Sequence, residues 1–252
     1  MNRVLIFFVT LFLQIYTVGA QDLSFLLQEG NKALSSKKYD AAISAYNNII
    51  KEEKVSSSVY YNLANAYLGN NNIAQAIIYY ERALKLDPLD RDIMNNLEIA
   101  KGKITDPIYA IEPFFISKYW HKFTSLLSFQ LWTIFSILLF IGAIIGLYFF
   151  LLGNTEKQNT LGKKCVIVAT AIFFLTLLIC VSRYMQLRSD DFAVVMENTN
   201  RYEGPDERSI SEESELSEGI KVRILDSYQE WIQVSLPDLS QAWIEAKVVE
   251  KI

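Results

Sequence analysis

The sequence predicts a multidomain membrane protein with an α-helical repeat module, a two-helix transmembrane hairpin and a small all-β module. Matching residue types recur at an interval of 34 residues in the N-terminal part of the chain. Two long central stretches, 131–152 and 165–181, contain no charged residue. Near the C-terminus, apolar and polar residues alternate, which is the pattern of β-strands with one buried face. These three patterns require three different kinds of structure.

The composition agrees with small domains joined through a membrane. Hydrophobic residues make up 51% of the 252 residues, and the formal net charge is -4. The apolar excess lies in the two central stretches and in residues 4–18. Nucleic-acid binding needs clustered lysine and arginine that displace counterions from phosphates. The chain has no such basic stripe, so we expect no nucleic-acid partner.

The N-terminus has the pattern of a secretory signal. Arg3 supplies a positive start, residues 4–18 form an apolar stretch, and Val18 and Ala20 are small residues at the positions that a signal peptidase reads. We predict a signal peptide over residues 1–20. The alternative is an uncleaved anchor helix of the same residues. Both interpretations start the mature chain outside the cytoplasm.

The two uncharged stretches are long enough to cross a bilayer as helices. We predict transmembrane helices at 131–152 and 165–182 with a cytoplasmic loop at 153–164 between them. The preceding segment, 106–130, mixes aromatic residues with lysines and is expected to lie at the membrane interface. Two crossings place the soluble modules on the same side, facing the periplasm. A charge-free span lacks the groups that ion paths and proton relays use, which argues against transport.

Small residues in the first span leave two interpretations open. Gly142 and Gly146 are four positions apart, a spacing that lets another helix approach closely. They are equally compatible with a helix that simply faces lipid. Cys165 and Cys180 both lie in the second span and are interpreted as packing residues.

The 34-residue interval resembles tetratricopeptide repeats. Gly30 and Ala64, Ala42 and Ala76, and Tyr46 and Tyr80 are the matched pairs. The second copy continues the resemblance with Tyr60, Leu63, Tyr67, Ala83 and Pro88. We predict a repeat domain at 21–105, with repeats at about 23–56 and 57–90 and a capping helix at 91–104. Stacked repeats need about three units to bury a continuous core. This module is therefore expected to pack against the juxtamembrane segment, a second copy or a partner.

The resemblance implies a peptide-binding groove along the first helices of the repeats. Four asparagines are expected to stand there in successive rows: Asn31, Asn62, Asn65 and Asn96. Asparagine amides can donate to and accept from an extended peptide backbone. Chaperone-binding relatives add basic residues that capture a C-terminal carboxylate, but Leu27, Asp92 and Asn96 occupy those positions here. The alternative is that the four asparagines are solvated helix surface.

The C-terminal part, 192–252, resembles a bacterial SH3-type domain, which implies a small all-β SH3-like barrel. The resemblance rests on Phe192 to Val195, Tyr202 to Pro205, Val222 to Leu225, Trp231 and Ala242 to Ile244. Ala242 departs from the glycine that the family usually has before tryptophan. Bacterial relatives bind cell-wall peptides or mediate assembly, and the residues do not choose between these roles. Acidic residues crowd 203–218 and indicate a solvated loop, with a site for a basic partner as the alternative.

No catalytic site is predicted. A nucleophilic serine or cysteine needs a base nearby, and His121 is the single histidine, next to the first span. The sequence also lacks a phosphate-binding glycine loop and a metal-ligand spacing. We therefore expect a protein that is not an enzyme and that uses no cofactor or metal.

The complete order of modules resembles the BatE proteins encoded in bacterial aerotolerance operons. The resemblance implies an inner-membrane scaffold for protein–protein interaction, whose partners are the other membrane proteins of a Bat-type complex, with von Willebrand-type domains. It also implies a role in aerotolerance or in envelope and oxidative stress. The alternative is a cell-wall-sensing receptor that binds peptidoglycan through its SH3-like domain.

Overall fold

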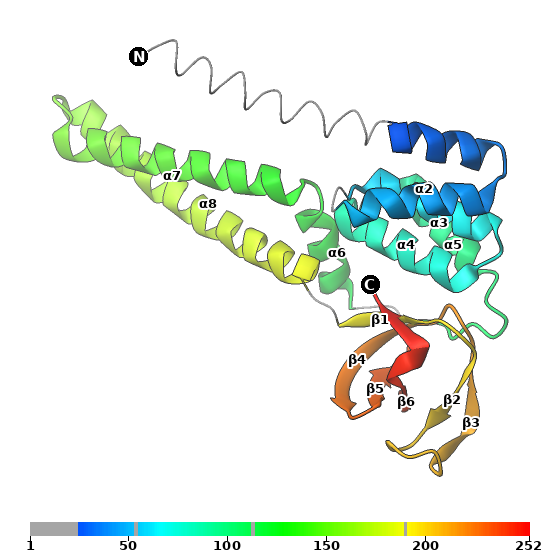
Figure 1. Cartoon of the computed structure of the whole chain (residues 1–252). Helices are drawn as coiled ribbons and strands as arrows, with labels where there is room; N and C mark the ends of the chain where they lie inside the picture. Colours follow the sequence, from blue (N-terminus) through cyan, green and yellow to red (C-terminus); the bar gives the residue numbers. More distant parts are fainter. Residues whose placement is uncertain (1–24, 53–54, 112–113, 189–190) are drawn as a thin grey trace. The chain divides into compact units, whose positions relative to one another are not determined.

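The computed structural model describes residues 25–52, 55–111, 114–188 and 191–252 (Figure 1). The chain divides into two compact units, Met1–Ile111 with Asp190–Ile252, and Glu112–Ser189. The first unit contains the repeat helices and the C-terminal sheet, and the second contains the long apolar helices. The signal peptide predicted for 1–20 lies outside the described residues.

The repeat module is a row of antiparallel helices. A helix over residues 25–35 is followed by α2 (Tyr39–Lys51), α3 (Ser57–Gly69), α4 (Ile73–Leu86) and α5 (Arg91–Lys101). The last three begin at capping residues, Ser56, Asn72 and Asp90, whose side chains accept hydrogen bonds from backbone N–H groups of the first turn. The helix α5 lies in the range 91–104 that is expected for a capping helix, and it ends at Lys101.

Small residues bring the helices of a repeat together. A Cβ atom on Gly30 would lie 2.8 Å from Cε1 of Tyr46, so only glycine lets the tyrosine ring pack against this helix. Tyr46 and Tyr80 are fully buried and belong to one core with Leu63, Ile77 and Leu97. Small and aromatic residues that recur in the repeat pattern thus build the core of the module.

The C-terminal region is an antiparallel sheet with the strand order β3-β2-β6-β5-β4-β1-β7. Its strands are β1 (Phe192–Val195), β2 (Thr199–Tyr202), β3 (Ile210–Leu216), β4 (Lys221–Tyr228), β5 (Trp231–Ser235), β6 (Gln241–Glu245) and β7 (Val249–Lys251). The predicted alternation is confirmed, since Val222, Ile232 and Val234 are buried. The sheet is not closed into the expected barrel, because β3 and β7 form its two edges.

The sheet packs directly against the repeat helices. Along β1, Ala193 and Val195 enter the core of the sheet, whereas Val194 is buried in the core of the repeats. The strand is therefore buried on both faces, which explains its continuous apolar sequence. The edge strand β7 is held against α4, where Arg82 donates to the carbonyl oxygen of Lys251 at 2.7 Å. A covered edge is protected from pairing with another chain.

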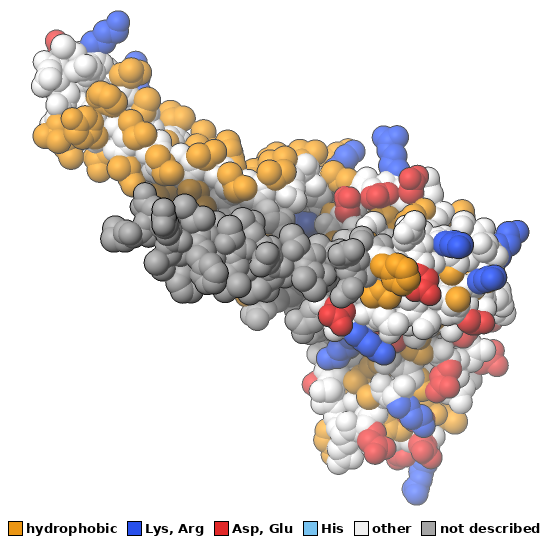
Figure 2. Space-filling model, turned by 45° about the horizontal axis from the view of Figure 1, so that its top comes forward, with side chains coloured by type: hydrophobic (Ala, Val, Ile, Leu, Met, Phe, Trp, Pro, Cys, Tyr) orange, Lys and Arg blue, Asp and Glu red, His pale blue; other side chains and the backbone are white. Residues whose placement is uncertain are grey.

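The second unit contains α6 (Phe115–Thr124) and a hairpin of α7 (Phe129–Leu152) and α8 (Glu156–Arg188). Two helices, Phe129–Leu152 and Glu156–Met185, are long and apolar enough to cross a membrane. Only 11% of an 18-residue apolar stretch in each helix is buried. Figure 2 shows hydrophobic side chains over the visible face of the hairpin. A core helix of a soluble protein would be mostly buried instead.

The connection in the hairpin is shorter than expected. The sequence predicts a loop at 153–164, but α8 already begins at Glu156. Polar residues can continue a helix beyond the apolar span when no proline or cap stops it. A Cβ on Gly162 would lie 2.4 Å from the backbone nitrogen of Phe150, so glycine at this position lets the two helices approach closely.

The two glycines of α7 fit different interpretations: Gly146 allows close approach of another helix, and Gly142 does not pack against one within the described chain. A Cβ on Gly146 would lie 3.1 Å from the Cβ of Cys165, so this glycine packs against α8 of the same chain. A Cβ on Gly142 would meet no atom within 4 Å among the described residues. Ser136 and Thr176 add a hydrogen bond of 3.2 Å between the two helices.

Candidate protein-interaction site

The four predicted asparagines lie on the first helices of the module. Asn31 is on the helix over residues 25–35, Asn62 and Asn65 are on α3, and Asn96 is on α5. Asn31 is exposed and the other three are half-buried. The structure therefore brings residues from three helices into one row, as the repeat pattern predicts.

The asparagines and two tyrosines form two equivalent sets of hydrogen bonds. In the first set, Oδ1 of Asn31 accepts from the Tyr46 hydroxyl at 2.7 Å and from Nδ2 of Asn62 at 3.2 Å. In the second set, Oδ1 of Asn65 accepts from the Tyr80 hydroxyl at 2.5 Å and from Nδ2 of Asn96 at 3.0 Å. Corresponding residues are 34 positions apart. We call these six residues the asparagine ladder.

The ladder satisfies the hydroxyl groups of the buried tyrosines. A buried hydroxyl without a partner destabilises a protein by about 1–3 kcal/mol. Burial raises the pKa of Tyr46 to about 12, partly opposed by the neighbouring amide of Asn62. Burial also raises the pKa of Tyr80, with the same opposing effect from Asn96. Both tyrosines are thus neutral hydrogen-bond donors at neutral pH.

The ladder corrects the interpretation of these asparagines as solvated surface. Each takes part in at least one hydrogen bond to another helix. Polar capacity remains, because Nδ2 of Asn31 and Oδ1 of Asn62 have no hydrogen bond within the described part of the chain. The same holds for Nδ2 of Asn65 and Oδ1 of Asn96. Each set therefore leaves one donor group and one acceptor group for a ligand.

Leu27 and Asp92 occupy positions where chaperone-binding relatives carry the basic residues that capture a carboxylate. Leu27 is half-buried and packs against the repeat core. Asp92 is exposed in the first turn of α5, where its charge interacts favourably with the helix dipole. Neither residue can attract an anion, so the arrangement suits a backbone or amide ligand better than a free C-terminus.

The contact between α4 and the sheet is a feature that the sequence analysis misses. Glu250 of β7 accepts from Nε2 of Gln75 at 3.1 Å and pairs with Arg82 at 3.0 Å. Glu81 pairs with Lys221 of β4 at 2.7 Å. The sheet of the same chain, which is not among the expected supports, covers α4. The apolar run Ala193 to Val195 was the available signal for this contact.

Comparison with known protein families identifies one element of this site. Residues 57–89 match the tetratricopeptide repeat family. The chain contains a tetratricopeptide repeat. The matched repeat comprises α3 and α4 and thus includes Asn62, Asn65 and Tyr80 of the ladder. Tetratricopeptide repeats imply protein–protein interaction. A search of curated proteins finds no match to the chain.

Proposed function

We propose that the chain is a membrane-anchored scaffold that binds partner proteins along its repeat helices. The observation that carries the proposal is the tetratricopeptide repeat at 57–89 together with the row of asparagines beside it. The ladder offers amide donors and acceptors at a regular interval that have no partner among the described residues, which suits the backbone of an extended peptide. The proposal assigns the chain a binding role and no reaction.

The anchor in this proposal is the hairpin of α7 and α8. Its support is the length of the two helices and their exposed apolar surface. With a signal peptide at 1–20, the repeats and the sheet face the periplasm of a bacterial inner membrane. Protease added to intact spheroplasts is expected to digest the repeats and the sheet but not the turn at 153–155. Protection of the repeats or of the sheet would contradict this topology.

The C-terminal region is proposed to be an SH3-type module that lacks barrel closure. Its support is the antiparallel sheet and the 3-10 turn η1 (Ala246–Val248) directly before the last strand. The resemblance of the complete chain to BatE proteins supports partners in a Bat-type complex with von Willebrand-type domains. It also supports a role in aerotolerance or envelope stress.

Affinity capture from native membranes tests the binding role. The protein is compared with a variant that carries Asn62→Arg and Asn96→Arg, which places two bulky cations in the row. A matched control carries Asn48→Arg and Asn95→Arg, because both residues are exposed and outside the ladder. We expect partner recovery to fall in the ladder variant only. Equal recovery from all three proteins would discredit the groove.

The same purified protein separates the scaffold from a cell-wall receptor. The full chain in detergent micelles is mixed with cell-wall sacculi and sedimented. The scaffold proposal expects the protein to stay in the supernatant, whereas sedimentation with the sacculi would favour binding of peptidoglycan through the sheet.

A further inference from the structure

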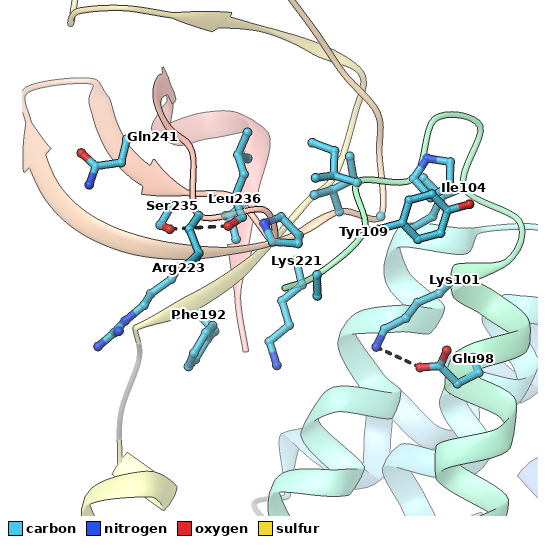
Figure 3. Close-up of a pocket in the computed structure, with 18 of the residues that line it drawn as sticks. Glu98, Lys101, Ile104, Tyr109, Phe192, Lys221, Arg223, Ser235, Leu236 and Gln241 are labelled. Carbon is cyan, nitrogen blue, oxygen red and sulfur yellow. Dashed lines mark hydrogen bonds and ion pairs between the residues drawn. The ribbon is translucent and has the colours of Figure 1, made fainter. Parts of the chain in front are cut away.

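A cavity of about 780 Å³ lies within the first unit, between α5, the segment that follows it and the sheet (Figure 3). Its volume is within the range of typical ligand sites, about 300–1,000 Å³. The lining is largely apolar and includes Ile104, Phe192 and Leu236. None of the four predicted asparagines lines it. The cavity is therefore a separate feature from the asparagine ladder.

The contact between the sheet and the repeats builds this cavity. Phe192 and Arg223 are paired across β1 and β4, so their side chains leave the sheet on the same face. Figure 3 shows both residues on the sheet side, with Lys101 and Glu98 on the helix opposite. Gly219 has φ of +88°, a backbone conformation that favours glycine, and a Cβ at this position would lie 3.1 Å from Cδ1 of Ile77, so that side chain would have to shift.

Most charges in the cavity are already paired. Lys221 pairs with Glu81 at 2.7 Å, and Lys101 pairs with Glu98 at 3.3 Å. Arg223 is exposed, and no ion pair involves it among the described residues. Among the described residues, the guanidinium of Arg223 is therefore a charge beside the apolar lining that no ion pair compensates. It offers several N–H donors to one carboxylate.

One wall of the cavity is backbone without regular secondary structure. Residues 107–110 have no helical or strand structure, and the N–H of Ile111 fixes their end by donating to the carbonyl oxygen of Pro237 at 3.0 Å. Within the described chain, the backbone groups of Tyr109 and Ala110 make no hydrogen bond. The Tyr109 side chain is 83% exposed. The unbonded backbone groups of this wall can donate hydrogen bonds to a peptide chain and accept hydrogen bonds from it, and the exposed ring of Tyr109 can contact its apolar side chains.

We propose that this cavity binds an extended peptide segment of a partner protein in which one acidic side chain stands among apolar residues. The carboxylate pairs with Arg223, the apolar side chains contact Phe192 and Tyr109, and the peptide backbone bonds to the backbone groups of Tyr109 and Ala110. The charge of Arg223 selects an acidic segment, and the backbone groups that are unbonded within the described residues select a peptide. This site does not depend on the proposed role of the asparagine ladder.

Binding is measured with the full chain in detergent micelles by fluorescence anisotropy. The probe is a short labelled peptide, acetylated and amidated, in which leucine and serine alternate around one central glutamate. Two further probes carry glutamine or lysine at the centre. We expect the glutamate peptide to bind most tightly, the glutamine peptide more weakly and the lysine peptide about tenfold more weakly than the first. Rising salt should reduce these differences.

Substitution of Arg223 supplies the decisive comparison. In R223E the order is expected to reverse, so that the lysine peptide binds more tightly than the glutamate peptide. The matched control is R208E, which changes the same charge at an exposed arginine in the turn between β2 and β3 and should keep the original order. In N62R/N96R the order should also remain.

Three results would overturn the proposal. They are an unchanged order in R223E, equal changes in R223E and R208E, and no measurable binding of the glutamate peptide. A fourth variant, Y109A, removes an exposed ring without disturbing the core. It should weaken all three peptides to a similar degree, and an unaffected affinity would remove Tyr109 from the site.

Discussion

The second helices of the two repeats, α2 and α4, are equivalent in the repeat pattern but meet different surroundings. Both bury an alanine and a tyrosine on the side that faces the first helices. On its other side α2 has small or polar exposed residues, whereas α4 has an apolar residue and long polar ones that contact the sheet. The equivalent pairs are Ala41 and Gln75, Ser44 and Ile78, and Asn48 and Arg82.

This difference shows how a short repeat array obtains a second layer. Residues that keep the repeat pattern pack the helices against each other. Residues that depart from the pattern, such as Gln75 and Arg82, contact the sheet. The guanidinium of Arg82 pairs with Glu250 of the sheet and lies 5.1 Å above the ring of Tyr79 in the same helix. The sheet of the same chain contacts α4 on one side of the repeat helices. The asparagine ladder lies on the first helices, away from this contact.

The largest expected effect comes from replacing Ile78 of α4 by serine, the residue at the equivalent position of α2. Ile78 is fully buried, and Ile78→Ser removes apolar contacts and buries a hydroxyl. We expect a loss of about 3 kcal/mol in the free energy of unfolding. The measurement is the thermal unfolding of the full chain in detergent micelles, followed by tryptophan fluorescence. The reverse change, Ser44→Ile in α2, is the control, and it should alter stability by less than about 0.5 kcal/mol. Similar losses in both variants would remove the distinction between the two helices.

The next prediction compares how much each set of the ladder contributes to the free energy of unfolding. Asn65→Ala leaves the buried hydroxyl of Tyr80 without its acceptor, and Asn31→Ala does the same to Tyr46. Each is expected to cost about 1–3 kcal/mol. Adding Tyr80→Phe to Asn65→Ala should recover most of the loss, because the unsatisfied hydroxyl is gone. Chemical denaturation of the solubilised protein measures all of these variants. No recovery would mean that the asparagine packs rather than accepts.

A smaller effect is expected at the ion pairs between α4 and the sheet. The Glu81 side chain is 11% exposed and pairs with Lys221 at 2.7 Å and with Lys101 at 3.9 Å. Glu81→Gln should reduce stability by about 1 kcal/mol, and less at high salt. The equivalent residue in α2 is Asn47, so Asn47→Gln is the matched control and should have no effect. A loss that does not change with salt would argue against an electrostatic contribution.

The smallest effect appears only in alkaline solution. The pKa of Tyr46 is raised to about 12 by burial, above its ordinary value of about 10. The unfolded chain therefore loses this proton first, so the stabilisation is complete below about pH 10 and is lost as pH rises towards 12. Melting temperatures measured across this range should fall less steeply in Tyr46→Phe than in the unchanged protein. Parallel curves would contradict the role of burial.

Local patterns predicted much of the fold because they act over short distances. The 34-residue interval located the repeat helices, and the row of Asn31, Asn62, Asn65 and Asn96 followed from it. The uncharged stretches located both long helices, but the second begins earlier than predicted because polar residues from Glu156 onward continue it. The hydrogen bonds of the ladder could not be predicted, since they depend on the rotamers of Tyr46 and Tyr80.

The kinds of structure in this protein could be predicted from the residues alone, because helix, strand and apolar span each have a period or length that is visible along the chain. The three-dimensional packing was needed to show that β1 is buried between two cores, that the sheet stays open with β7 against α4, and that Arg223, beside an apolar cavity, has no ion pair within the described chain. These features join residues more than a hundred positions apart, such as Glu81 and Lys221. Such pairings depend on how surfaces fit, and no periodicity records that.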